Sequence, residues 1–182
     1  MVVLMAGPAP LSDFFLDREQ TERSLVELAE GQHLSLVCRA VMVCDGTLTR
    51  LLSAVYLEDI LTVCEAADEA RPGIEASRWL QIDGSCLRRR VSLVGGVSGR
   101  TYARAQAHLY APRLPDTFLI ELSRPGASLG AQLLSSGICH RRELIWIRPG
   151  TGDCMFTRLY RILVRDQPAI LIKEDVLHGG EL

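Results

Sequence analysis

Two charged residues interrupt rows of aliphatic side chains in segments where apolar and polar residues alternate as they do in β-strands. Alternate side chains of a strand point to opposite faces of a sheet. In "CLRRRVSLVGG" (residues 86–96), Arg89 therefore shares a face with leucine and valine. In "AILIKEDVL" (residues 169–177), Glu174 shares a face with isoleucine and valine. Because a buried charge is costly unless it is paired or hydrogen-bonded, each residue needs a partner.

Either the two faces are less buried than the alternation suggests, or one of two arrangements satisfies both residues. In the first, Arg89 and Glu174 pair with each other inside the core. In the second, both line a closed pocket, where the planar fork of arginine binds an anionic ligand. Desolvation raises the pKa of a carboxyl in such a pocket, so Glu174 would then be able to act as an acid. Ser128, in "ASLGAQLL", is a candidate N-cap that would leave backbone N–H groups of the next residues free to face an anion.

The length of the chain favours a single domain, residues 1–182, and the scattered cysteines discussed below favour the cytoplasm. A net charge of −2 gives no electrostatic footprint for nucleic acid or an anionic membrane, so we expect neither as a partner. No apolar run reaches membrane-spanning length, and the N-terminus lacks the basic start of a signal peptide. Oligomeric state leaves no mark on the sequence, and we take a monomer as the expectation.

The cysteines and histidines show no metal-ligand spacing, and no cofactor is expected. The six cysteines form no C-x-x-C pair, which argues against both a zinc site and a disulfide framework. We therefore expect reduced, mostly buried thiols. They are Cys38, Cys44, Cys64, Cys86, Cys139 and Cys154.

The elements that would position these residues indicate an α+β fold. After a loose lead-in (1–15), helical patterns cover 17–31, 33–44 and 45–56, the last with Asp45 as N-cap. Short helices are expected within 116–126 and 128–136. The strand patterns are 59–66, a hairpin of 85–94 with 100–110, 139–147, and a hairpin of 157–165 with 168–177. Tight turns between consecutive strands predict one antiparallel sheet of about six strands with flanking helices.

Five segments, in their order and spacing, resemble the chorismate pyruvate-lyase family. They are "DGTLTRLL" (45–52), "LRRRVSLVGG" (87–96), "PRLP" (112–115), "SLGAQLL" (128–134) and "YRILVRDQPAILIKEDVL" (160–177). The resemblance covers roughly residues 30–177. It implies a six-stranded antiparallel sheet around an enclosed site, and elimination of pyruvate from chorismate to give 4-hydroxybenzoate. Members of the family use no metal or organic cofactor.

The same resemblance implies roles for four residues. Arg89 would bind the ring carboxylate, and Glu174 would meet the oxygen of the bond that breaks, so these two are the predicted catalytic residues. Leu129 would offer its backbone amide to the substrate, and Leu48 would line the pocket where relatives often have methionine. Gln106 stands where many relatives carry a glutamate, a difference that bears on substrate choice.

Another function fits the same fold. Effector-binding domains of bacterial transcription regulators share it and sense small ligands without chemistry, so this chain would then be a non-catalytic domain that binds a small aromatic acid. Such regulators usually carry a helix-turn-helix domain upstream, whereas the helices before residue 59 match those of the lyase. On that ground the sequence favours the lyase. A protein that retains 4-hydroxybenzoate without turnover is a further alternative.

Overall fold

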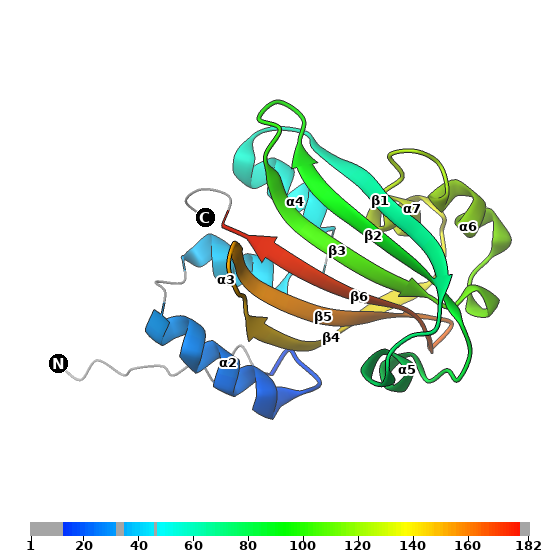
Figure 1. Cartoon of the computed structure of the whole chain (residues 1–182), viewed down its shortest axis with the longest axis horizontal. Helices are drawn as coiled ribbons and strands as arrows, with labels where there is room; N and C mark the ends of the chain where they lie inside the picture. Colours follow the sequence, from blue (N-terminus) through cyan, green and yellow to red (C-terminus); the bar gives the residue numbers. More distant parts are fainter. Residues whose placement is uncertain (1–12, 32–34, 46, 179–182) are drawn as a thin grey trace.

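Six antiparallel strands form one sheet in the computed structural model of the chain, which describes residues 13–31, 35–45 and 47–178 (Figure 1). The strands are β1 (Ile60–Ala70), β2 (Cys86–Gly95), β3 (Thr101–Leu109), β4 (His140–Pro149), β5 (Cys154–Val164) and β6 (Gln167–Leu177). Their order across the sheet is β1-β2-β3-β6-β5-β4. The two hairpins β2–β3 and β5–β6 therefore meet in the middle of the sheet, where β3 pairs with β6.

Helices cover the two faces of the sheet unequally. They are α2 (Arg18–Gly31), α3 (Leu36–Val43), α4 (Leu48–Tyr56), α5 (Ile74–Leu80), α6 (Asp116–Leu122) and α7 (Leu129–Ser135), with a 3₁₀ turn at Ala111–Arg113. All except α5 contribute to the larger core on one face, while α5 packs with Trp146, Leu159 and Leu171 in a smaller cluster on the other. No helix in the described ranges is long and apolar enough to cross a membrane.

The predicted α+β fold and both predicted hairpins are confirmed. Leu87 pairs with Leu109 in the first hairpin, and Val164 pairs with Gln167 in the second. The N-cap prediction at Asp45 is wrong, because α4 begins two residues later than expected, with Thr47 as its N-cap. Helix α5 was not predicted, because its seven residues are too few to show a helical period and its N-cap is a glycine without a capping side chain.

The predicted lead-in is wrong at its C-terminal end. Residues 1–12 lie outside the described residues, but Phe15 is buried and forms a parallel bridge with Leu144 of β4. The next residue continues the pairing, since the N–H of Leu16 donates to the carbonyl of Leu144 over 2.9 Å. This segment therefore covers the outer edge of β4, which would otherwise expose unpaired backbone groups.

The cysteines differ from expectation in their burial. All six are free, but only Cys38 and Cys86 are buried, whereas Cys64 and Cys139 are exposed. Both exposed thiols lie at the margins of the sheet, on or next to its edge strands β1 and β4. The expectation of mostly buried thiols is therefore wrong.

A carboxylate holds the turn of the β2–β3 hairpin. Glu58 accepts hydrogen bonds from the hydroxyl of Tyr102 and from the N–H groups of Val97 and Ser98, both over 2.9 Å. The bond from Tyr102 is the largest of the causes that lower the pKa of Glu58 from 4.5 to about 2. The ionised carboxylate thus fastens the hairpin that carries Arg89.

We expect Glu58→Gln to lower the free energy of unfolding at pH 7 and to lose this effect in acid. The folded-state pKa lies below the ordinary value of 4.5, so the stabilisation is complete above that value and disappears as the pH falls toward about 2. Denaturant unfolding of both proteins at several pH values measures it. Glu27→Gln, at an exposed carboxylate of α2, is the control. A wild-type-to-variant difference that does not change with pH would contradict the role.

Candidate functional site

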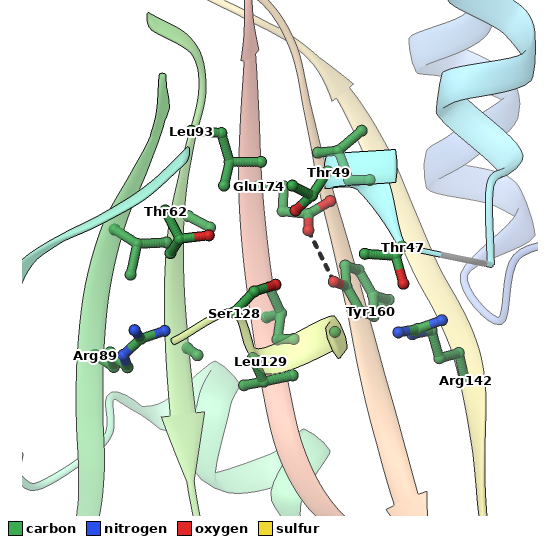
Figure 2. Close-up of a pocket in the computed structure, with 16 residues that line it drawn as sticks. Thr47, Thr49, Thr62, Arg89, Leu93, Ser128, Leu129, Arg142, Tyr160 and Glu174 are labelled. Carbon is green, nitrogen blue, oxygen red and sulfur yellow. Dashed lines mark hydrogen bonds between the residues drawn. The ribbon is translucent and has the colours of Figure 1, made fainter. Parts of the chain in front are cut away.

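The inner face of the sheet, α4 and the start of α7 line a cavity of about 60 Å³ (Figure 2). A cavity of this size has room for several water molecules or a small ligand. Its walls combine aliphatic residues such as Val91, Leu93 and Ile172 with a few polar groups. An apolar pocket with a few convergent polar groups is typical of a small-molecule site.

The structure brings the four predicted site residues together. Arg89, Glu174, Leu129 and Leu48 all line this cavity, although they come from β2, β6, α7 and α4. Their roles in binding stay predictions. Gln106 does not line the cavity; its side chain instead contacts the His108 ring at 3.0 Å.

Arg89 is buried, and the described part of the chain gives it no acidic partner. Only 5% of the residue is exposed, and its Nη2 donates to the main-chain carbonyl of Ala127 over 2.6 Å. No ion pair within the described residues involves Arg89. Its cross-strand neighbours are Ala67 and Ala107, whose small side chains leave space beside the guanidinium. The first arrangement considered for the sequence, a core pair of Arg89 with Glu174, is therefore not formed.

Glu174 instead pairs with Arg158 of β5. Both Nε and Nη2 of Arg158 lie 2.7 Å from Oε2 of Glu174, and the hydroxyl of Tyr160 donates to Oε1 over 2.8 Å. Burial, and then the charge of Glu174, raise the pKa of Tyr160 well above 10, so the phenol stays protonated and donates. Burial is the largest single effect on Arg158 and lowers its pKa, but the charge and hydrogen bond of Glu174, together with Tyr160 and Cys44, raise the pKa of Arg158 on balance. Glu174 is thus one half of a satisfied ion pair.

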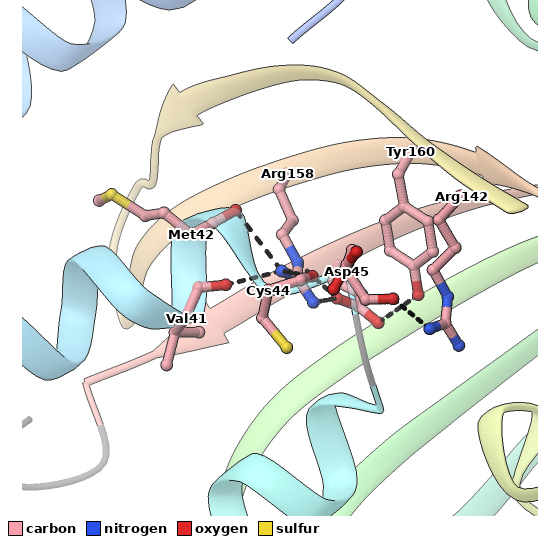
Figure 3. Close-up of polar contacts among 8 residues, drawn as sticks. Val41, Met42, Cys44, Asp45, Arg142, Arg158 and Tyr160 are labelled. Carbon is pink, nitrogen blue, oxygen red and sulfur yellow. Dashed lines mark hydrogen bonds and ion pairs between the residues drawn. The ribbon is translucent and has the colours of Figure 1, made fainter. Parts of the chain in front are cut away.

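Arg158 also holds the chain segment that leads into α4 (Figure 3). Its Nη1 donates to the carbonyls of Val41 and Cys44 over 2.6 and 2.9 Å. These carbonyls lie at the C-terminal end of α3, where a cation is favourable because the carbonyl dipoles point outward. One side chain therefore links the carboxylate of the cavity to the connection between two helices.

Sequence reasoning missed two arginines of this region. Arg158 shares a strand face with Tyr160 and Ile162, so the alternation rule that singled out Arg89 was sufficient to find it. Arg142 also lines the cavity, from β4. It follows Arg141 directly, and the two adjacent arginines give no sign of which one faces inward.

The start of α7 agrees with its prediction in part. Ser128 is the N-cap, and its hydroxyl accepts a hydrogen bond from the N–H of Ala131 over 3.5 Å. Both Ser128 and Leu129 line the cavity. The use of the Leu129 amide by a ligand stays a prediction.

Comparison with solved structures finds proteins of similar fold. The effector domain of PhnF from Mycobacterium smegmatis matches with a TM-score of 0.54 and 15% identity, over 74% of this chain and 90% of that one. The structure of PhnF itself matches with a TM-score of 0.53 and 15% identity, over 73% of this chain. The chain spans 64% of the length of that PhnF chain. A GntR-family transcriptional regulator from Enterococcus faecalis matches with a TM-score of 0.44 and 11% identity, over 66% of this chain and 96% of that one.

At such low identity these matches establish the fold, which effector domains share with chorismate lyase. A scan against protein-family models finds no match. A search of curated proteins finds no similar sequence.

Two predictions are corrected by these findings. The chain was expected to be an enzyme, a chorismate pyruvate-lyase, but the structures that it matches are regulator effector domains. The geometry offers a physical reason, because the predicted acid Glu174 is already bound by Arg158 and Tyr160. The expectation that nucleic acid is not a partner is also corrected, because the matched structures, PhnF and its effector domain, belong to regulators that bind DNA.

Proposed function

We propose that this chain is an effector-binding domain that holds a small organic anion in its cavity without transforming it. The observation that carries the proposal is Arg89, a buried guanidinium that lines the cavity and has no described carboxylate beside it. A buried charge without a counterion is costly, and an anionic ligand would remove that cost. The aliphatic walls favour an organic body between the polar ends. Similarity to the effector domain of PhnF supports the same role.

The ion pair beside the cavity suits a sensor better than a catalyst. A catalytic acid must be free to exchange its proton with the substrate, whereas Glu174 accepts hydrogen bonds from Nε of Arg158 and the hydroxyl of Tyr160 and forms an ion pair with Nη2 of Arg158. Arg158 joins this carboxylate to the connection between α3 and α4. A ligand shifts a conformational equilibrium only through different affinities for its two states. We propose that ligand binding shifts the conformational equilibrium of this domain, and that a DNA-binding partner senses the shift.

Calorimetric titration with 4-hydroxybenzoate tests the proposal. We expect the wild-type protein to bind this monoanion and Arg89→Gln to weaken binding roughly 10- to 100-fold, because charge-assisted hydrogen bonds are lost. Arg90→Gln is the matched control: Arg90 is the next residue of β2, and its exposed side chain lies on the opposite face. Equal losses in the two variants, or no effect of Arg89→Gln, would contradict the assignment.

Incubation with chorismate separates sensing from catalysis. We expect no release of pyruvate from chorismate by the wild-type protein, assayed with lactate dehydrogenase and NADH. Turnover that disappears in Glu174→Gln would overturn the proposal, since it would give that carboxyl a chemical role. A wild-type protein that binds neither chorismate nor 4-hydroxybenzoate would also count against it.

A further inference from the structure

Two buried polar atoms at one end of the cavity have no hydrogen-bond partner. Within the described residues, three buried side-chain nitrogen or oxygen atoms are unpaired, and two of them belong to cavity residues: Nε of Arg142 and Oγ1 of Thr47. Leaving a buried donor unpaired is expensive, so native proteins rarely do so without a reason. Figure 2 draws both side chains on the side of the cavity opposite Arg89, and Arg142 donates to the carbonyl of Asp45, two residues before Thr47. The unpaired atoms therefore mark a place where a ligand atom would be bound.

Arg142 is a second cation that forms no ion pair with an acidic residue of the described ranges. Its Nη1 donates to the main-chain carbonyl of Asp45, and no ion pair within the described residues involves it (Figure 3). The cavity carboxylate is already engaged, because Glu174 pairs with Arg158 over 2.7 Å. Arg89 and Arg142 are thus two positive charges that no acidic residue in the described ranges neutralises.

The two arginines that lack a described acidic partner, Arg89 and Arg142, lie on opposite sides of the cavity (Figure 2). Arg89 comes from β2 and Arg142 from β4, and three strands separate β2 from β4 in the sheet order. At the usual spacing of strands, the backbones of Arg89 and Arg142 are roughly 19 Å apart in the direction perpendicular to the strands. The two side chains therefore reach into the cavity from opposite ends. A single acid group would not bridge both guanidinium groups.

The position of Thr47 is set by close packing. It is the N-cap of α4, but its hydroxyl makes no capping bond, which leaves that hydroxyl free for another partner. Gly130 of α7 packs against it so closely that a Cβ there would lie 2.8 Å from the Thr47 methyl group. The hydroxyl is therefore held at the same end of the cavity as Arg142. The start of a helix also favours negative charge.

We propose that the ligand is a small dianion: one acid group binds Arg89, and a second binds Nε–H of Arg142 and the hydroxyl of Thr47. The inference rests on the proposed function and makes it more specific, since it adds a second recognition point and a charge class. The second group is a carboxylate or a phosphate-like acid, because both present the oxygen acceptors that a guanidinium and a hydroxyl bind. Arg89 thereby recognises acids in general, and Arg142 with Thr47 selects those with two anionic ends.

Matched pairs of ligands test this selection. Titrations compare 4-hydroxybenzoate with terephthalate and 4-phosphonobenzoate, and hexanoate with the flexible dicarboxylate adipate. In the wild-type protein we expect at least one dianion to bind about tenfold or more tightly than its monoanionic counterpart. Arg142→Gln should remove this preference and change the affinity for the monoanion by about twofold at most. Thr47→Val, which removes the hydroxyl at nearly constant size, should reduce the preference in part.

Arg141→Gln is the control, because Arg141 is the preceding residue and its exposed side chain pairs with Glu143. Equal wild-type affinities for monoanions and dianions, with Arg89→Gln still disruptive, would overturn this inference and leave the proposed function intact. A preference for dianions that survives in Arg142→Gln, or falls equally in Arg141→Gln, would also overturn it. Failure of every ligand to bind the wild-type protein would instead count against the proposed function itself. The relative affinities of terephthalate and 4-phosphonobenzoate show which acid the Arg142 end prefers.

Discussion

Replacing Arg158 by methionine should lower the free energy of unfolding by about 3–5 kcal/mol. The residue is 1% exposed and supplies both nitrogens that pair with Glu174. Its removal leaves a buried carboxylate with the hydroxyl of Tyr160 as its remaining described donor. It also removes the donor that holds the carbonyls of Val41 and Cys44. Methionine has a similar length, so the loss reports on charge and hydrogen bonding more than on volume.

Denaturant unfolding at pH 7 measures the effect, with Arg104→Met as the control. Arg104 pairs with Asp153 over 3.1 Å on the surface of the sheet, where an ion pair contributes about 0–1 kcal/mol. The double variant Arg158→Met with Glu174→Gln should recover part of the loss, since it no longer buries an unpaired charge. A loss in Arg158→Met no larger than that in Arg104→Met would show that the buried pair is not structural.

The alternation of side chains was sufficient to predict the sheet and half of the charged site. Period-two patterns located both hairpins, and the two charges on apolar faces, Arg89 and Glu174, do line one cavity. The same rule applied to "TRLYRILV" would have included Arg158. These inferences succeed because they depend on one local property, the pleat of a strand.

The partner of Glu174 was beyond the reach of local patterns. Counting back from the turn, where Val164 pairs with Gln167, an even ladder would set Arg158 opposite Lys173. A register shift between residues 162 and 163 moves the pairing by one residue, so that Arg158 faces Glu174. A β-bulge of this kind leaves little sign in a sequence but decides which side chains meet. The prediction that Glu174 acts as an acid assumed that it had no such partner.

The activity was mispredicted for a different reason. The motifs that resemble chorismate pyruvate-lyase lie in the parts of the chain that build the sheet and the cavity, and effector domains share that architecture. One fold can serve either catalysis or sensing, and the difference lies in a few side chains. In this chain Arg158 pairs with the Glu174 carboxylate, and Arg142 adds a cation that pairs with no acid in the described residues.

Replacing Arg89 by methionine should have the opposite effect to the Arg158 variant. In the unliganded protein Arg89 is a buried cation whose described partner is a neutral carbonyl, that of Ala127. An apolar side chain of similar length relieves the desolvation cost of the charge and loses one hydrogen bond. We therefore expect the free energy of unfolding to rise by about 1–2 kcal/mol. Binding residues often lower the stability of the protein that carries them.

The same variant should lose its response to ligand. At a concentration one hundred times the dissociation constant, a ligand that binds only the folded state stabilises it by about 2.7 kcal/mol. We expect 4-hydroxybenzoate at that concentration to stabilise the wild-type protein and Arg90→Met by this amount, and Arg89→Met hardly at all. Denaturant unfolding with and without ligand provides all the values. If Arg89→Met destabilised the unliganded protein as much as Arg158→Met does, Arg89 would be a structural residue. Since an anion compensates the charge of Arg89 only when it is bound, higher stability without ligand and loss of the ligand response should appear together in one variant.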